Sequence, residues 1–419
     1  VDRKALQVAA DSRASKVELT SQYLAPRTPT EQVLADIWGE ILQLKDVGVH
    51  DHFFELGGHS LLATQLVSRV QSLFRITLPL LQIFERPTIA TLAEVITQAQ
   101  AGANSHQGES GYVITRARRG IPLPLSFAQE RMWFLYRLSP DAVAYNIPAS
   151  VRLHGPLNKP ALRWAVAELV RRHDALRTTF AHVDGQPRQI IQDVLDPTWT
   201  EEDLRGVPAE LREPRALELA TAEARRPFDL EQGPLLRVFL IQLGDEDQIV
   251  ILNTHHIISD QWSYGIIARE LVTSYNAFCA GRPFAVQPDL AIQYADFAQW
   301  QRGWLTGPVL EEQLAHWKTK LVDLPVLTLP TDRPRLPVHS FKGDHVSLDL
   351  SWSLINRLKQ LSVREGVTLY MVFLAGFFGL LHRLTQQKDL VIGTPIANRN
   401  RLEIEDLIGT FVNTLVLRA

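Results

Sequence analysis

Two adjacent histidines and an aspartate, His255, His256 and Asp260, follow an apolar run at residues 249–254. An imidazole with a reference pKa of about 6.5 accepts or donates a proton near neutral pH, which suits general acid or base chemistry. Neighbouring side chains in an extended segment point to opposite sides, so we expect only one histidine to face a substrate. Asp260 has two alternative duties, to orient a histidine or to pair with an arginine. The spacing alone also fits two histidines packed at a strand end.

The segments on either side of these residues predict how they are held. Turn-forming residues at 244–247 precede the apolar run, which is typical of a buried strand. Residues 262–280 carry apolar side chains at helical spacing, and Gly281 provides a stop. The histidines and Asp260 are therefore expected in a loop between a strand and a helix.

A serine, Ser60, stands behind a glycine pair in an earlier part of the chain. Helices are predicted from a cap at Thr30, from Ser60 and from Thr88, so residues 28–98 are expected to form a small helical bundle. The two glycines free the backbone ahead of Ser60, which leaves its hydroxyl open to modification by an enzyme. The alternative is an ordinary helix-capping serine. Only His59 is close enough in sequence to act as a base, so a hydrolase nucleophile is not expected.

Composition narrows the class of protein. A chain of 419 residues has room for about three domains. A net charge of −3 offers no electrostatic reason to expect nucleic acid or an anionic membrane as a partner. No signal peptide is visible, and no apolar run reaches the roughly 20 residues that cross a bilayer. The single cysteine, Cys279, excludes an internal disulfide and a thiolate zinc cluster, and no metal site is predicted. We expect a cytoplasmic protein.

The run DHFFELGGHSLLATQL at residues 51–66 resembles the core motif of peptidyl carrier proteins from non-ribosomal peptide synthetases. This resemblance implies that Ser60 carries a 4′-phosphopantetheine arm, attached by a phosphopantetheinyl transferase. Residues 1–6, VDRKAL, are similar to the end of an adenylation domain. Residues 1–27 are therefore expected to be the tail and linker of an upstream adenylation domain, and residues 28–98 the carrier domain.

Residues 99–120 are a second expected linker, and residues 121–419 resemble a condensation domain at five motifs in the family's order. These motifs are SFAQERMW at 126–133, RHDALRTTF at 172–180, HHIISD at 255–260, YADFAQW at 294–300 and IGTFVNT at 408–414. The resemblance implies a multidomain chain, in which an all-α four-helix carrier bundle precedes an α/β chloramphenicol-acetyltransferase-like domain of two lobes. Because the family continues beyond the last motif, we expect an incomplete C-terminal lobe.

The resemblance also implies roles for single residues. His256, the second histidine, acts on carrier-bound aminoacyl or peptidyl thioesters that meet in a tunnel between the lobes. The donor hangs from Ser60, and its carbonyl forms an amide bond with the amine on a downstream acceptor carrier. Asp260 is expected to pair with Arg399. Ser126, Arg131 and Asn413 are expected to line the tunnel or hold the lobes together, with a structural role favoured for Arg131.

Departures from the family motifs leave alternatives open. Gln261 stands where the family has a glycine, which serves a backbone turn or leaves space. It is the one feature that favours a degenerate condensation fold acting as a docking platform for a tailoring enzyme. A free-standing acyltransferase that uses coenzyme A thioesters is disfavoured by the attached carrier.

Other activities of the family are disfavoured by single positions. Heterocyclisation domains have an aspartate at the position of His255. Domains linked to β-lactam formation have an extra histidine at the position of Thr254. Residues 106–125 lack the additional histidine motif of domains that also epimerise. His59 favours ordinary condensation of an L-configured donor.

Overall fold

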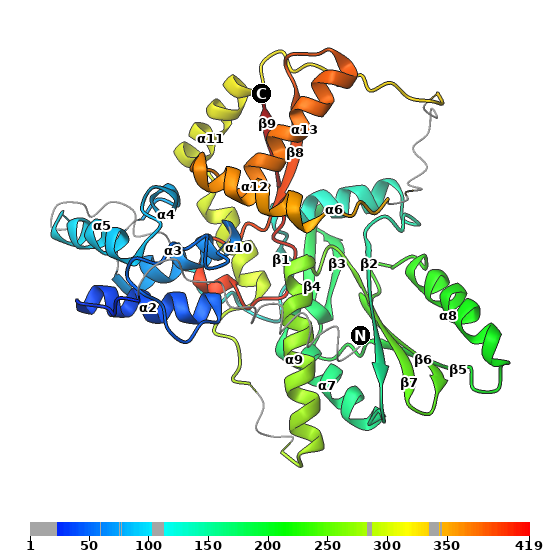
Figure 1. Cartoon of the computed structure of the whole chain (residues 1–419). Coiled ribbons are helices and arrows are strands. Elements are labelled where there is room, and N and C mark those ends of the chain that lie inside the picture. Colours follow the sequence, from blue (N-terminus) through cyan, green and yellow to red (C-terminus); the bar gives the residue numbers. More distant parts are fainter. Residues whose placement is uncertain are drawn as a thin grey trace. The chain divides into compact units, whose positions relative to one another are not determined.

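The structure is a computed structural model of the whole chain, shown in Figure 1. It describes residues 23–58, 60–74, 76, 78–102, 113–282, 287–334, 343 and 346–419. These residues form two compact units. One holds residues 113–313 and 403–412, and the other holds residues 23–102, 314–402 and 413–419. Residues 1–22 of the expected adenylation-domain tail and linker (residues 1–27) lie outside the described residues, as does the interpretation of His59.

Four helices form the predicted bundle near the N-terminus. They are α2 (Pro29–Leu42), α3 (Ser60–Phe74), α4 (Leu81–Glu85) and α5 (Ile89–Gly102). Their apolar faces meet in one core, whose fully buried members include Leu34, Trp38, Phe53, Leu66, Ile83 and Leu92. The expected cap at Thr30 is wrong, because the Thr28 hydroxyl accepts the Glu31 N–H at 3.1 Å and Pro29 opens the helix. Proline suits the first helical position because its missing N–H has no partner there.

A four-stranded sheet forms the centre of the first α/β lobe. Its order is β2 (Asn146–His154), β7 (Asp247–His255), β6 (Leu236–Gly244) and β5 (Thr198–Asp203). Only β5 runs parallel to its neighbour β6, and the other pairs are antiparallel. The strand predicted for the apolar run at residues 249–254 is confirmed, because that run lies within β7.

Both faces of this sheet are covered by helices. On β6, Leu236, Val238 and Leu240 pack with α7 (Lys159–Arg172) and α9 (Gln261–Cys279). The alternate residues Phe239 and Ile241 pack with α8 (Ala209–Ala224). Figure 1 shows α8 on the opposite side of the sheet from α7 and α9. This two-residue alternation decides which side chains at the end of β7 face α9.

A smaller sheet of order β1-β4-β3 lies in the same unit, with two helices and a 3₁₀ turn nearby. These elements are β1 (Leu123–Pro124), α6 (Phe127–Leu138), η2 (Asp174–Arg177), β3 (Thr178–Val183), β4 (Gln186–Ile191) and α10 (Tyr294–Trp304).

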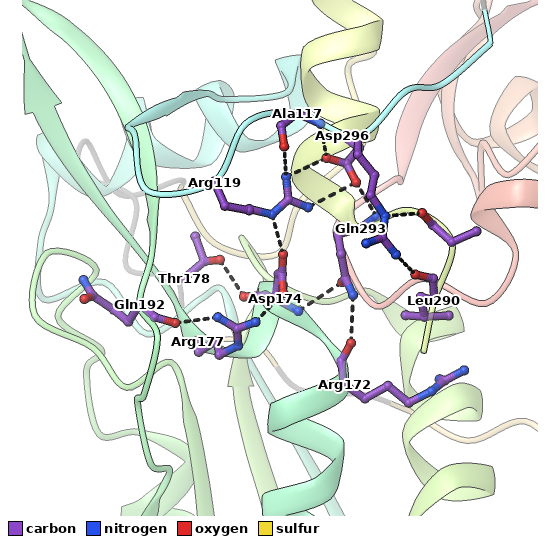
Figure 2. Close-up of polar contacts among 12 residues, drawn as sticks. Ala117, Arg119, Arg172, Asp174, Arg177, Thr178, Gln192, Leu290, Gln293 and Asp296 are labelled. Carbon is purple, nitrogen blue, oxygen red and sulfur yellow. Dashed lines mark hydrogen bonds and ion pairs between the residues drawn. The ribbon is translucent and has the colours of Figure 1, made fainter. Parts of the chain in front are cut away.

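Arg119, which precedes β1, binds two of these elements, η2 and α10 (Figure 2). Its guanidinium donates to both oxygens of Asp296, at 2.7 and 3.1 Å, and to Asp174 at 2.9 Å. The fully buried Asp296 also accepts the backbone N–H of Ala117 at 2.8 Å and that of Gln293 at 2.7 Å. Aspartates of the second and fourth motifs are thus bound by one arginine from the segment at the start of this unit.

The remaining elements are α11 (Gly307–Lys320), α12 (Trp352–Arg364), α13 (Leu369–Thr385), β8 (Val391–Ile396), η3 (Leu402–Ile404) and β9 (Asn413–Arg418). β8 and β9 pair antiparallel, and Arg418 binds Asp389 through two hydrogen bonds of 2.9 and 2.6 Å. Within the described part of the chain, no single helix is long and apolar enough to cross a membrane. Helices α12 and α13 are long and apolar enough to do so only when they are taken together, and they are bent by 105° at the break between them.

Candidate functional site

The two histidines lie where β7 leaves the sheet. His255 is the last residue of the strand and pairs in register with Asn146 of β2. The backbone N–H of His255 donates to Leu235 at 3.1 Å, and that of His256 donates to Tyr145 at 2.8 Å. Both neighbours of β7 therefore hold the exit of the strand, and the predicted strand, loop and helix order around Asp260 is confirmed.

The His255 ring points into the protein. Its side chain is 4% exposed, and its Nδ1 accepts the backbone N–H of Ile257 at 3.1 Å. Burial and then the neighbouring His256 lower the pKa of His255 to about 3. A neutral ring whose Nδ1 accepts a backbone hydrogen bond is suited to stabilising the loop rather than to transferring protons.

The His256 ring is half-buried and has a different partner. Its Nδ1 lies 2.8 Å from the carbonyl oxygen of Ser259. A carbonyl oxygen only accepts, so Nδ1 carries the proton in this contact. In the neutral ring, the other nitrogen, Nε2, is then the unprotonated one and can accept a proton or a hydrogen bond. The geometry therefore equips His256, rather than His255, for base chemistry.

Asp260 caps helix α9 and holds a distant segment. Its Oδ1 accepts the backbone N–H of Ser263 at 2.9 Å and the hydroxyl of Ser263 at 2.7 Å. Its Oδ2 accepts the backbone N–H of Phe411 at 3.1 Å. Arg399 is buried. The expected ion pair between Asp260 and Arg399 stays a prediction.

Two further contacts bind the start of α9 to residues 403–412. The Ser263 hydroxyl accepts the backbone N–H of Gly409 at 3.1 Å, and the Trp262 indole donates to the carbonyl of Glu405 at 3.0 Å. A β-carbon on Gly409 would lie 1.9 Å from the ring of Tyr294, so the packing requires glycine there. The third, fourth and fifth motifs thus meet around the loop that carries His256.

The weaker site candidates are dispersed. Ser126 is fully buried, caps α6 by accepting the N–H of Gln129 at 3.1 Å, and lies 2.7 Å from the Tyr294 hydroxyl. Arg131 and Asn413 are exposed, and the Asn413 side chain accepts the N–H of Thr414 at 2.9 Å. Of these three, Ser126 alone belongs to the buried contacts around Tyr294.

Gln261 is the exposed first residue of α9. Gln261 is α-helical and its φ is not positive, so this position does not need the left-handed backbone conformation that favours glycine. The interpretation that a glycine serves a backbone turn at this position therefore does not apply to this chain.

Ser60 begins α3 and follows a tight turn, and its side chain lies outside the described part of the structure. Gly57 has a φ of +97°, a value that favours glycine. A β-carbon on Gly58 would lie 2.4 Å from the Phe53 ring and 2.5 Å from the Phe53 carbonyl oxygen. The turn ahead of α3 therefore requires both glycines, and a serine at the start of that helix fits a site of covalent attachment.

Sequence reasoning missed residues that act through long-range contacts. Arg119 is one, and Glu270 of α9 is another. Glu270 lies 3.0 Å from Nε2 of His173 and also binds Arg172, both in the second motif. Burial raises the pKa of Glu270, but the contacts with His173 and Arg172 outweigh it and lower that pKa. No local pattern marks either residue, because their partners lie far away in sequence.

Comparison with known families agrees with both predicted domains. The family described as "Condensation domain" matches residues 122–419, and the family described as "Phosphopantetheine attachment site" matches residues 32–96. One linear gramicidin synthase polypeptide of Brevibacillus parabrevis is 48% identical over 422 residues, which cover 100% of this chain. The chain spans 8% of the length of that relative.

Two solved structures each resemble a little under three quarters of the chain. The complex of the X-domain and OxyB from teicoplanin biosynthesis matches 74% of this chain and 68% of the solved one, with a TM-score of 0.64 and 28% identity. The first condensation domain of the calcium-dependent antibiotic synthetase, in complex with a substrate analogue, matches 72% and 70%. Its TM-score is 0.60 and its identity 23%, a likeness of fold.

Proposed function

The chain belongs to the condensation-domain family and joins that domain to a phosphopantetheine attachment domain, and we propose that it forms amide bonds in non-ribosomal peptide synthesis. A 4′-phosphopantetheine arm on Ser60 supplies a thiol that holds the donor acyl group as a thioester. The proposed acceptor is the amine of an aminoacyl group on a downstream carrier domain. An upstream adenylation domain and a phosphopantetheinyl transferase are the other proposed partners, and the cytoplasm is the proposed location.

The observation that carries the proposal is the hydrogen bond from His256 Nδ1 to Ser259, which makes Nε2 the acceptor. In the proposed step, the acceptor amine attacks the donor carbonyl carbon, a C–N bond forms and the C–S bond breaks. Nε2 of His256 accepts the proton that the amine loses, and that proton ends on the released thiol. An α-amino group has a reference pKa near 8, so a weak base suffices.

The other loop residues are proposed to hold His256 in place. His255 stays neutral and accepts the Ile257 N–H, and Asp260 caps α9 while binding Phe411. Holding both reactants on carriers makes their encounter effectively unimolecular, which lowers the barrier without further chemistry from the protein. The loop therefore needs to orient one amine rather than to form a covalent intermediate.

The test follows dipeptide formation on the acceptor carrier by intact-protein mass spectrometry. A polypeptide that contains these 419 residues and continues to the acceptor carrier is loaded on Ser60 with an aminoacyl-phosphopantetheine. We expect transfer in this chain, and none from Ser60→Ala. His256→Ala should lower the rate roughly 10²-fold or more. His154→Ala, which alters an exposed histidine of β2, is the matched control.

The alternative is the docking platform. The X-domain from teicoplanin biosynthesis, solved in complex with OxyB, resembles this chain. A domain of similar fold can therefore bind another protein. We favour catalysis because His256 keeps an acceptor nitrogen and the loop contacts of Asp260 are intact. Loading without transfer across several donors and acceptors, also in Gln261→Gly, would favour the platform.

A further inference from the structure

Three hydroxyl groups form a buried chain behind the His256 loop. The Ser259 hydroxyl lies 2.5 Å from the Thr254 hydroxyl, and the Thr254 hydroxyl lies 2.9 Å from that of Tyr264. The Tyr264 hydroxyl in turn donates to the backbone carbonyl of Ile147 on β2. The chain therefore runs from the loop, through the end of β7 and the first turns of α9, to the neighbouring strand.

The direction of each hydrogen bond follows from the last acceptor. A carbonyl oxygen cannot donate, so the Tyr264 proton points to Ile147. The Tyr264 oxygen must then accept from Thr254, and the Thr254 oxygen must accept from Ser259. Each hydroxyl has one proton, so every donor in the chain is committed. Tyr264 is the group that sets the order.

Burial makes these hydrogen-bond directions difficult to change. Thr254 and Ser259 are fully buried, so water does not reach their hydroxyls freely. Burial raises the pKa of Tyr264 to about 12, with hydrogen bonding from Thr254 opposing it, so the phenol keeps its proton at neutral pH. An unpaired hydroxyl in such surroundings is costly, and therefore the three groups hold one another in a single arrangement.

Ser259 links this chain to the candidate base. Its side chain is the first donor of the chain, and its backbone carbonyl is the acceptor for His256 Nδ1 at 2.8 Å. We propose that Tyr264, acting through Thr254 and Ser259, is a positioning residue that keeps the His256 ring protonated on Nδ1 and unprotonated on Nε2. The consequence for catalysis rests on the proposed function, but the effect on the ring does not.

Removal of the Tyr264 hydroxyl has a defined consequence. Thr254 then has only the Ser259 oxygen as an acceptor within the chain, so its proton turns toward Ser259. The Ser259 hydroxyl loses its acceptor, and this residue has to rotate. The carbonyl contact with His256 weakens, and the ring is released toward the other tautomer. A net hydrogen bond of typical strength corresponds to roughly a three- to tenfold change in such an equilibrium.

The first experiment reads the ring directly. Nitrogen NMR of the histidine-labelled 419-residue chain, well above the reference histidine pKa of about 6.5, distinguishes protonated from unprotonated ring nitrogens. The His256 signal is identified by its loss in His256→Gln. In the unsubstituted protein we expect the His256 proton on Nδ1. In Tyr264→Phe and Thr254→Val the population with the proton on Nε2 should rise roughly threefold or more. Thr254→Ser keeps a hydroxyl at this position and should therefore keep the His256 tautomer of the unsubstituted protein.

Tyr275→Phe is the matched control. Tyr275 lies on the same helix, and its hydroxyl accepts the backbone N–H of Asn158 at 2.9 Å, which leaves it outside the chain to Ser259. We expect no change of the His256 tautomer in this variant. The double variant Tyr264→Phe with Thr254→Val should resemble either single variant, because both break the same chain.

The second experiment measures condensation in the same variants. Tyr264→Phe should lower kcat roughly three- to tenfold, with KM for the acceptor carrier unchanged. An unchanged His256 tautomer in folded Tyr264→Phe and Thr254→Val would overturn the proposal. A shifted tautomer in a chain that forms no dipeptide would support the positioning role and reject the proposed function instead.

Discussion

The carboxylate of Asp260 accepts a hydrogen bond of 3.1 Å from the backbone N–H of Phe411, which lies 151 residues further along the chain. The other carboxylate oxygen caps α9 through Ser263. One aspartate therefore starts the helix behind the His256 loop and binds the segment of the last motif to it.

Replacement of Asp260 by alanine should destabilise the protein by about 3 kcal/mol. The variant loses a helix cap and leaves the buried N–H groups of Ser263 and Phe411 without their acceptor. Asp260→Asn keeps an acceptor oxygen and should lose about half as much. Urea unfolding measures the difference, with Asp141→Ala at an exposed position as the control. Equal stability of Asp260→Ala and Asp141→Ala would contradict the role of this carboxylate.

Acidification should unfold the protein partly through His255. Its folded pKa of about 3 lies below the unfolded value of about 6.5, so the unfolded chain binds more protons between these limits. The contribution of His255 to the free energy of unfolding is therefore fully present above pH 6.5 and is lost as the pH decreases, by up to about 1.4 kcal/mol per pH unit.

The variant His255→Asn cannot titrate, so its stability should depend less steeply on pH between 6.5 and 4. Urea titrations at several pH values in both proteins measure this slope. The same slope in both proteins would mean that the His255 ring is accessible to protons in the folded state.

Gly409→Ala should destabilise the protein by about 1–3 kcal/mol. Its β-carbon would lie 1.9 Å from the Tyr294 ring, so either the ring or the backbone has to move. Gly265→Ala on α9 is the control, because apart from its chain neighbours and the nearby helix backbone no atom lies within 4 Å of the added β-carbon. That change should instead stabilise the helix by about 0.5–1 kcal/mol. Thermal melting of both variants is the measurement, and a neutral Gly409→Ala would show that Tyr294 yields easily.

Arg119→Ala should destabilise the protein by about 2 kcal/mol. The side chain of Asp296 is 0% exposed and would lose its cationic partner, although two backbone N–H groups remain. The figure is below that for a fully buried pair because Arg119 is 34% exposed. Its exposed neighbour Arg118 gives the control Arg118→Ala. Chemical denaturation of the two variants should differ, and identical midpoints would contradict the role of Arg119.

Local patterns in the sequence were sufficient to predict the carrier bundle and the order of strand, loop and helix around Asp260. Periodicity and turn chemistry act over a few residues, so they are visible without a structure. The helix start at Ser60 was predictable for the same reason, because the glycines at 57 and 58 and the helix start are neighbours in sequence. The cap at Thr30 was wrong by two residues, since a proline at the first helical position moved the start of α2 to Pro29.

Tertiary structure alone decided which residues support the His256 ring. Strand register and helix packing bring Tyr264, Thr254 and Ser259 together, and they direct His255 inward while His256 meets the Ser259 carbonyl. The contacts of Asp260 with Phe411 and of Arg119 with Asp296 join segments more than 150 residues apart. Such pairs form only when a whole lobe is folded, and for that reason no local sequence pattern predicts them.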